Sequence, residues 1–267
     1  MKLKVFRRGS YILNPISLSN QMKICLVVPH YNHAEAFLRF LPKLVSIEMP
    51  CIVVDDGSTQ QNLDKLKTGL EHSDLNSYLF CHDYNRGKGA AVFTAATHAR
   101  TLGFTHILQI DADGQHDIAD VEKFIQLSNQ YPQAIISGHP QFDKTAPKAR
   151  VYGRKVTDFW VALETLSLEI KDSLCGFRVY PLKELEQVSD KFLIGKRMDF
   201  DTDIAVKSVW SGISIKFIPT KVIYHQESDS HFYYIRDNLL LIKLHVRLML
   251  GMLWRSPWLI YRKFKSS

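Results

Sequence analysis

The stretch His-Ile-Leu-Gln-Ile-Asp-Ala-Asp-Gly-Gln-His, residues 106–116, decides how the fold is interpreted. Its apolar half predicts a buried strand that ends at two carboxylates two positions apart, Asp111 and Asp113. Both could reach one hard divalent cation, with the amide oxygen of Gln115 as a third ligand. Open α/β sheets bind ligands at the carboxyl ends of strands, so the stretch predicts a metal-assisted site for a diphosphate substrate. The alternative is an Asp-Gly turn with solvated acids.

The composition of the 267-residue chain is that of an ordinary globular protein, with 46% hydrophobic and 23% charged residues. This length allows one large or two small domains. The formal charge of +7 indicates an anionic partner without choosing between nucleic acid, a membrane surface and phosphate-bearing substrates. Nucleic-acid binding would predict a basic stripe with exposed aromatic residues. The basic residues are spread along the chain instead, so no nucleic-acid partner is expected.

Cysteine usage and the absence of targeting signals predict a cytoplasmic protein. The four cysteines form no CxxC pair, which favours reduced thiols over a disulfide framework. The basic first twenty residues lack a sustained apolar segment, so a secretory signal is not expected. No stretch approaches 18 uncharged apolar residues, and no transmembrane helix is predicted.

Short apolar runs alternate with segments of helical periodicity. Strands are predicted at residues 24–28, 52–54, 78–81, 107–110 and 134–137, and helices at 34–45, 91–99 and 118–128. This alternation predicts an α/β fold with a mainly parallel sheet and helices on both faces. The second half, with predicted helices at 155–170 and 200–210 and strands at 175–180 and 213–218, is expected to extend the same sheet. Phe159 and Trp160 share helical spacing with Leu163 and are expected in the core.

The last segment has apolar residues interrupted by Lys243, His245 and Arg247. A basic helix with aromatic anchors, here Trp254 and Trp258, is suited to the plane of a membrane interface. The alternative is a helix that docks on the domain or pairs with another subunit in a homo-oligomer. The chain is therefore divided into an N-terminal extension (1–21), an α/β domain (22–236) and a C-terminal amphipathic helix (237–267).

Four polar loops follow predicted strands, at residues 29–32, 55–58, 85–89 and 111–115. In a doubly wound sheet such loops converge on one crevice. Asp55 and Asp56 could bind ribose hydroxyls or a base edge, although an Asp-Gly-Ser turn that caps a helix uses the same residues. Lys88 lies between two glycines at a helix start, where anions are favoured. The alternative there is a tight turn with a solvated lysine, and the spacing fits neither a Walker A loop nor a dinucleotide fingerprint.

The order of these motifs resembles the family 2 glycosyltransferases, which have the GT-A (Rossmann-like) fold. The motifs are Val-Val-Pro-x-Tyr-Asn (27–32), Val-Val-Asp-Asp-Gly-Ser (53–58), Asn-x-Gly-Lys-Gly-x-Ala (85–91) and Asp-Ala-Asp-Gly-Gln-His (111–116). They are most similar to the dolichyl- or polyprenyl-phosphate mannose and glucose synthase branch. The resemblance covers roughly residues 22–235.

The resemblance implies a UDP- or GDP-linked sugar donor and Mg²⁺ or Mn²⁺ as cofactor. The residues expected to bind the nucleotide sugar are Pro29, Tyr31, Asn32, Asp55, Asp56, Lys88, Asp111, Ala112 and Asp113. Asp111, Asp113 and Gln115 would hold the metal. The process implied is cell-envelope glycan or glycolipid synthesis, on the cytoplasmic face of the membrane.

The second half resembles the acceptor side of that branch. Residues 172–178 look like its Asp-x-x-x-Gly-Phe-Arg/Lys segment, and residues 227–232 stand where the family has a mobile loop over the diphosphate. The residues implied in acceptor or phosphate binding are Arg150, Arg154, Ser173, Arg178, Ser230, His231 and Arg236. Two positions depart from the pattern: His33 replaces a usual Glu, and His231 replaces a frequent Lys, so phosphate contact there would depend on pH.

The expected chemistry is inverting glycosyl transfer to a lipid or glycan acceptor. A lipid phosphate such as polyprenyl phosphate needs little general base, because a phosphomonoester is largely ionised at pH 7 (second pKa about 6). Arg150, Arg154 and Arg178 would then clamp the phosphate. A hydroxyl acceptor needs a carboxylate base, and the candidates are Asp203 first, then Asp201 and Asp172.

A purely structural role for the acidic segment and two different classes of protein are also compatible with this sequence. Residues 199–203 could simply place charge at a helix N-terminus, which the helix dipole stabilises. A nucleotidyltransferase would also be α/β and metal-dependent, but it would show a Gly-rich loop after the first strand. A non-catalytic binder of anionic lipids is favoured by net charge alone.

Overall fold

The computed structural model describes residues 6–7, 22–142, 148–222 and 234–266. One eight-stranded sheet forms the centre of the molecule, with the strand order β1-β4-β3-β2-β5-β7-β6-β8. The strands are β1 (Phe6–Arg7), β2 (Ile24–His30), β3 (Cys51–Asp55), β4 (Ser77–Cys81), β5 (His106–Gln109), β6 (Ile135–Gln141), β7 (Arg178–Pro181) and β8 (Ile215–Lys221). All neighbouring pairs are parallel except those made by β1 and β7.

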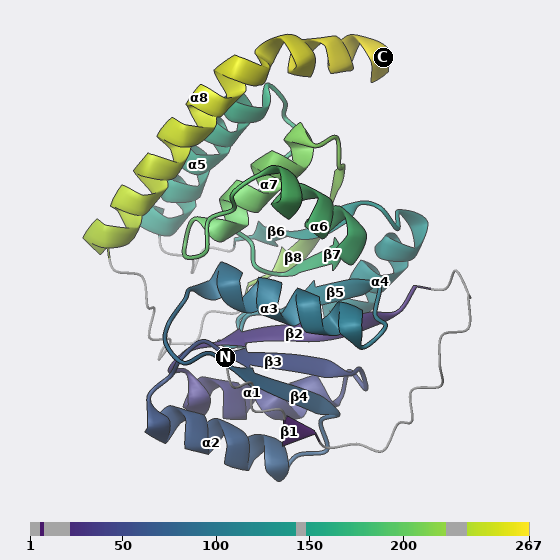
Figure 1. Ribbon diagram of the computed structural model, residues 1–267, viewed down its shortest axis with the longest axis vertical. Coiled ribbons are helices and arrows are strands. Elements are labelled where there is room, and N and C mark those ends of the chain that lie inside the picture. The colour runs from purple at the N-terminus through teal and green to yellow at the C-terminus, as the bar shows by residue number, and fades with distance from the viewer. Residues whose placement is uncertain (1–5, 8–21, 143–147, 223–233, 267) are drawn as a thin grey trace.

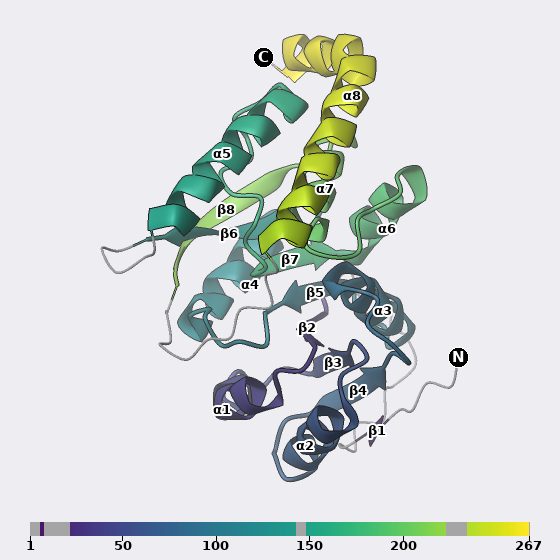
Figure 2. The same ribbon diagram turned by 90° about the vertical axis from the view of Figure 1, so that its left-hand side faces the viewer.

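Helices cover both faces of the sheet, as Figures 1 and 2 show. One face carries α1 (Ala34–Val45), α2 (Gln60–Glu71) and α4 (Val121–Gln130), the last preceded by a 3₁₀ turn at Ile118–Asp120. The other carries α3 (Lys88–Thr101), α6 (Leu182–Lys191) and α7 (Phe200–Trp210). Two long helices, α5 (Lys148–Thr165) and α8 (Tyr234–Ser266), run side by side and pack against α7.

The apolar pattern of the sequence explains this layering. Every residue of β3 is buried, because helices lie on both sides of the strand. In α1 the buried positions Ala34, Phe37, Leu41 and Leu44 recur every three or four residues, so one stripe of the helix faces the sheet. The α/β fold and the extension of the sheet by the second half of the chain are confirmed.

The position of β2 creates the crevice that holds the site. β2 pairs with β3 on one side and with β5 on the other, so the direction of strand succession reverses there. The loops after β2 and β5 therefore leave the same edge of the sheet side by side. A reversal of this kind is where open α/β sheets bind ligands.

Two features of the helices differ from the sequence predictions. α5 begins at Lys148, earlier than predicted, and Phe159 and Trp160 on it are 61% and 39% exposed. Their expected place in the core is therefore wrong: Trp160 contacts His245 of α8 only partly, with 6.3 Å between ring centroids, and both side chains stay exposed. Within the described ranges, no helix has the length and apolar character needed to cross a membrane.

Candidate active site

Asp111 follows β5 at the edge of the crevice and faces a lysine from another element. The Nζ atom of Lys88, at the start of α3, lies 2.9 Å from the carboxylate of Asp111. Burial alone would raise the pKa of the Asp111 carboxyl, but Lys88 and His116 hold this pKa well below its usual range. Asp111 is therefore ionised at neutral pH.

Lys88 also connects the start of α3 to the first turn of α7. Its Nζ atom also lies 2.9 Å from Oδ2 of Asp201, in the first turn of α7. Burial disfavours the charged amine, but the two carboxylates outweigh this and raise the pKa of Lys88. Gly176 lies directly behind this group, and a Cβ atom at that position would collide with both Asp111 and Lys88.

Asp113 is the second carboxylate of the predicted metal pair. Its Oδ1 atom accepts a hydrogen bond of 3.0 Å from the backbone of Gln115. Burial and the charge of Asp111 raise the pKa of the Asp113 carboxyl. The two acids therefore repel each other.

The residues around Asp111 and Asp113 fit one divalent cation. The ammonium of Lys88 pairs with Asp111 and Asp201, and Asp113 adds a third carboxyl group close enough to Asp111 for their charges to interact. Oδ1 of Asp201 is buried without a hydrogen-bond partner, which is a costly arrangement for a carboxylate oxygen. No cluster of three His, Cys, Asp or Glu ligands occurs among the described residues. A metal here would therefore need oxygen from Gln115 or from substrate phosphates, as magnesium sites commonly do.

His116 was not among the predicted site residues, although it closes the same motif. It is buried, and its Nε2 atom lies 3.6 Å from Oδ2 of Asp111. Its ring packs on Phe177, with 5.1 Å between ring centroids. The only signal in the sequence was its position directly after Gln115.

The loops after β2 and β3 hold each other through their polar side chains. Asp55 is buried, and its carboxylate binds His30 Nδ1 at 2.8 Å and the hydroxyl of Ser58 at 2.5 Å. Asn32 accepts a hydrogen bond of 2.9 Å from the backbone of Thr59. The predicted contact of Asp55 with a ribose is thus at odds with the structure, in which Asp55 is part of the turn. Pro29 and Tyr31 are half-buried next to this turn, and Ala112 is buried behind the crevice.

Asp56 organises the loop that precedes α3. Its carboxylate accepts hydrogen bonds from the backbone of Arg86 at 2.9 Å and of Gly87 at 2.7 Å, and it also binds His82. These amides were predicted to favour a ligand anion, but a carboxylate of the chain itself takes that role. The cationic side chains of this loop are those of Arg86 and Lys88, and the ammonium of Lys88 lies at the crevice beside Asp111.

The predicted acceptor segment after α5 is held by a buried acid. Asp172 pairs with Arg154 of α5 and accepts backbone hydrogen bonds from Leu174 at 2.9 Å and Cys175 at 2.7 Å. Ser173 is also buried, and its hydroxyl lies 3.1 Å from that of Thr202. This leaves Asp172 and Ser173 as residues that shape the segment, with Arg154 as the basic residue at its surface.

Arg178, the third residue predicted to clamp a phosphate, is buried. It is only 1% exposed, and its guanidinium donates to the Ser137 hydroxyl and to the backbone oxygens of Asp201 and Ser173 at 2.7–3.0 Å. These donor contacts of Arg178 are all made within the chain, and its contact with an acceptor stays a prediction. Arg178 ties β7 to β6 and to the start of α7, which positions Asp201.

Asp203, the first candidate for a catalytic base, is also a structural residue. It is fully buried, with Lys207 at 2.5 Å and Arg247 of α8 at 3.0 Å, and it accepts a hydrogen bond of 2.7 Å from the backbone of Gly195. These contacts hold the Asp203 carboxylate between two cations and a backbone amide of the chain itself. Asp201, which precedes it by two positions on the same helix, is the acid of this pair that reaches the crevice.

The remaining predicted residues lie at the limits of the described structure. Ser230 and His231 fall outside the described residues. The backbones of Arg150 and Arg236 belong to α5 and α8, but their side chains are not described. Asp158 on α5 was missed by the sequence analysis; burial and the charge of Asp172 raise its pKa to about 6.

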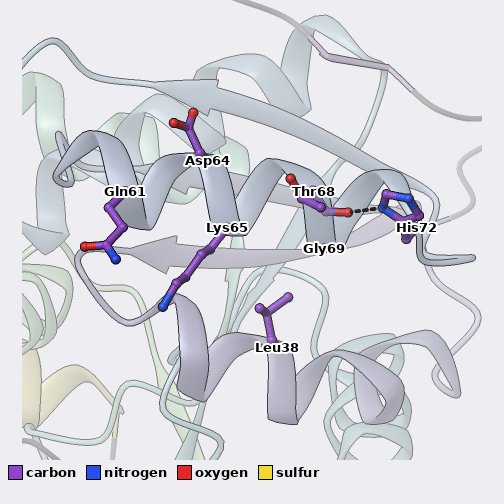
Figure 3. A pocket seen from close by; sticks show the side chains of 7 residues that line it. All are labelled: Leu38, Gln61, Asp64, Lys65, Thr68, Gly69 and His72. Atoms are coloured by element: carbon purple, nitrogen blue, oxygen red, sulfur yellow. Dashed lines mark hydrogen bonds between the residues drawn. The ribbon is translucent and has the colours of Figure 1, made fainter.

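A hollow elsewhere on the surface does not contain the predicted chemistry. It lies between α1 and α2, as Figure 3 shows, and its lining residues are Leu38, Gln61, Asp64, Lys65, Thr68, Gly69 and His72. None of the predicted site residues contributes to it. The site is therefore assigned to the loops at the end of β5 and the start of α3 and α7.

Comparison with known proteins identifies a family model and several relatives that match this chain. The model of the family "Glycosyl transferase family 2" matches residues 25–183. UDP-N-acetylglucosamine–dolichyl-phosphate N-acetylglucosaminyltransferase of Methanococcus voltae is 25% identical over 221 residues, which are 77% of this chain and 87% of the relative. Polyprenol monophosphomannose synthase of Mycolicibacterium smegmatis is 23% identical over 224 residues, with 77% and 79% covered.

A solved structure shares the fold. Glucosyl-3-phosphoglycerate synthase from Mycobacterium tuberculosis, in complex with Mn²⁺, uridine diphosphate and phosphoglyceric acid, superposes with a TM-score of 0.59 at 14% identity. The match covers 87% of this chain and 77% of that one, which shows a GT-A-like architecture. The family model covers more than half of the sequence, and the chain therefore belongs to glycosyl transferase family 2 and is a glycosyltransferase.

Proposed function

We propose that the protein is a metal-dependent, inverting glycosyltransferase that moves a sugar from a UDP- or GDP-sugar to a lipid phosphate such as polyprenyl phosphate. It works as a peripheral protein on the cytoplasmic face of the membrane, in cell-envelope glycan or glycolipid synthesis. Two relatives named above are dolichyl- or polyprenyl-phosphate glycosyltransferases. The donor and metal assignments rest on the crevice around Asp111, Asp113 and Lys88.

The proposal of a phosphate acceptor rests on the ion pairs that the three candidate bases make within the chain. Asp172 is paired with Arg154, Asp201 with Lys88, and Asp203 with Lys207 and Arg247. Each of these three acids is thus engaged by a cation of the chain itself. A phosphomonoester already carries its negative charge at pH 7 and needs no such acid as a base.

The charged residues of the crevice also suggest how the diphosphate of the donor would be bound. A bound Mg²⁺ or Mn²⁺ would offset the charge that develops on the departing nucleoside diphosphate. Asp111, Asp113 and Gln115 would hold it, and Lys88 would supply a second positive charge to the phosphates. The acceptor phosphate would approach from the side of Arg154. It would attack the anomeric carbon of the sugar on the face opposite to the departing nucleoside diphosphate.

Membrane association is supported by the surface that α5 and α8 form together, which we call the α5–α8 surface. Its exposed apolar side chains are Tyr152, Val156, Phe159, Trp160, Leu163, Leu239, Ile242, Val246, Leu250, Leu253, Trp254, Trp258, Ile260, Tyr261 and Phe264. The only acidic residue of α8 is Asp237, and it is buried. An exposed apolar face on a basic helix is suited to a membrane interface.

The raised pKa of Asp158 favours a second class of acceptor, in which the attacking group is a hydroxyl. With its pKa raised to about 6, this carboxylate is suited to act as a general base near neutral pH. It lies on α5, near Arg154 and Asp172. A hydroxyl of a lipid or glycan would then be the acceptor, and Asp158 would take its proton.

The two acceptor classes can be separated with one pair of lipids. Purified protein is incubated with labelled UDP- or GDP-sugars, Mn²⁺, and either a polyprenyl phosphate or the alcohol of the same chain. Transfer to the phosphate with no transfer to the alcohol supports the proposal. Transfer to the alcohol that is lost in Asp158→Asn would refute the phosphate acceptor and favour the second class.

A further inference from the structure

Lys88 occupies a position between acids that also form the metal site. We propose that Lys88 is an internal counter-ion, which leaves Asp111 when a divalent cation binds and then pairs with the donor diphosphate. This inference rests on the metal dependence in the proposed function. It makes metal and nucleotide binding depend on each other through one side chain.

The geometry shows that lysine and metal compete. The Nζ atom of Lys88 lies 2.9 Å from Oδ1 and 3.2 Å from Oδ2 of Asp111, so it engages both oxygens of the carboxylate. A metal held by Asp111 and Asp113 needs at least one of these oxygens. Two positive centres cannot share them at contact distance without strong repulsion. Metal binding must therefore move the ammonium.

The side chain of Lys88 can move away from Asp111. Its side chain is 23% exposed, and four rotatable bonds connect Nζ to the backbone at the start of α3. Asp201 holds it at 2.9 Å from the opposite side and can keep it next to the crevice. The backbone amides of Arg86 and Gly87 are occupied by Asp56. The ammonium of Lys88, which already lies at the crevice beside Asp111, is thus placed to turn to a phosphate.

The charges of the site favour a state that contains both the divalent cation and Lys88 over a state in which Lys88 alone takes the place of the metal. Lys88 makes its ion pairs with Asp111 and Asp201, and none with Asp113. Oδ1 of Asp201 is buried and lacks a partner. One ammonium therefore leaves part of the acidic group unbalanced, and a divalent cation at Asp111 and Asp113 completes the balance while Lys88 stays near Asp201.

The test is Mn²⁺ binding in the absence of nucleotide, measured by calorimetry on the full chain. Lys88→Met removes the competing charge and is expected to bind Mn²⁺ about tenfold more tightly than the unaltered protein. Lys88→Arg keeps the charge and should bind Mn²⁺ as the unaltered protein does. Asp201→Asn leaves Lys88 with Asp111 alone and should weaken Mn²⁺ binding.

The matched control is Lys196→Met, because Lys196 is exposed and its backbone oxygen contacts Gly89 in the same region. This variant removes the same charge without freeing Asp111, and its Mn²⁺ affinity should change less than about twofold. Circular dichroism verifies that each variant is folded. Lys88→Met that binds Mn²⁺ no more tightly than Lys196→Met overturns the proposal.

The second half of the exchange is tested with UDP and GDP at saturating Mn²⁺. Lys88→Met should bind the nucleotide that the unaltered protein prefers about tenfold more weakly, because the diphosphate loses its ammonium partner. Unchanged nucleotide affinity would overturn this half. If Lys88→Met shows the expected changes in Mn²⁺ and nucleotide affinity but the unaltered protein transfers no sugar, the proposed function is wrong and the exchange of Lys88 is still supported. Absence of Mn²⁺ binding in every variant would refute both.

Discussion

The guanidinium of Arg247 in α8 lies 3.0 Å from the carboxylate of Asp203 in α7, which is fully buried. The same carboxylate accepts a hydrogen bond from the backbone of Gly195. The next residue, Lys196, accepts a hydrogen bond of 2.9 Å from Gly89 at the start of α3. A continuous set of contacts therefore connects the C-terminal helix to the loop that carries Lys88.

This connection predicts that α8 stabilises the site from a distance. Arg247→Ala leaves Asp203 with one cation fewer, and the free energy of unfolding should fall by about 1–2 kcal/mol. Amide hydrogen exchange at residues 192–199 should become faster, because Asp203 holds Gly195. The control is Lys243→Ala, an exposed position on the same helix. Equal exchange in the two variants would contradict the connection.

Asp201 and Asp203 should respond differently to the same substitution. Asp203→Asn leaves the buried ammonium of Lys207 without a carboxylate, so urea unfolding should show a loss of about 3 kcal/mol or more. Asp201→Asn should cost less stability, about 1 kcal/mol, and should impair sugar transfer because Lys88 loses its second carboxylate. If Asp203→Asn is as stable as the unaltered protein but inactive, Asp203 has a catalytic role and its structural role is refuted.

The stability of the protein should depend on Asp158 in a defined pH range. Its pKa rises from about 3.8 in the unfolded chain to about 6 in the folded one. The folded protein therefore binds more protons between these values, and stability falls as the pH rises through this window. Asp158→Asn should be about 1 kcal/mol more stable than the unaltered protein at pH 7.5, given partial exposure, and about equal at pH 4. Thermal unfolding at both pH values measures this, with exposed Asp74→Asn as control.

The α5–α8 surface should bind anionic membranes. Phe159→Ser with Trp254→Ser removes two exposed aromatic side chains, one from each helix, and should weaken binding to vesicles that contain anionic lipid by about tenfold. Co-sedimentation with vesicles measures the effect. Tyr131→Ser, directly after α4, is the control for loss of an exposed aromatic residue. Equal binding by the double variant and the control would mean that this surface serves another purpose.

Much of the fold was predictable because the strands are short, apolar and followed by polar loops. The predicted helix 34–45 matches α1, and the predicted helix 200–210 matches α7. The exposed aromatic residues of α5 were misplaced, because periodicity identifies an apolar stripe but not what covers it. The antiparallel direction of β7 was likewise not visible, since a strand's direction depends on its partners and not on its own residues.

The meeting of the polar loops at one edge of the sheet was predictable, and the contacts of the acidic residues were less so. Motif order placed Asp111 and Lys88 at one edge of the sheet, where the structure brings them together. Asp56, Asp203 and Arg178 have the residue types of functional groups, yet they are buried with partners from distant segments. Those partners, such as Arg247 for Asp203, are decided by tertiary packing, which no local spacing reveals.

The most direct test of the central claim is turnover of a sugar nucleotide at the acidic pair. Purified protein and Asp113→Ala are given UDP- and GDP-sugars with polyprenyl phosphate, with and without Mn²⁺, and the released nucleoside diphosphate is measured. We predict release that needs Mn²⁺ and falls at least about a hundredfold in Asp113→Ala. Release that is independent of metal and equal in both proteins would contradict the account.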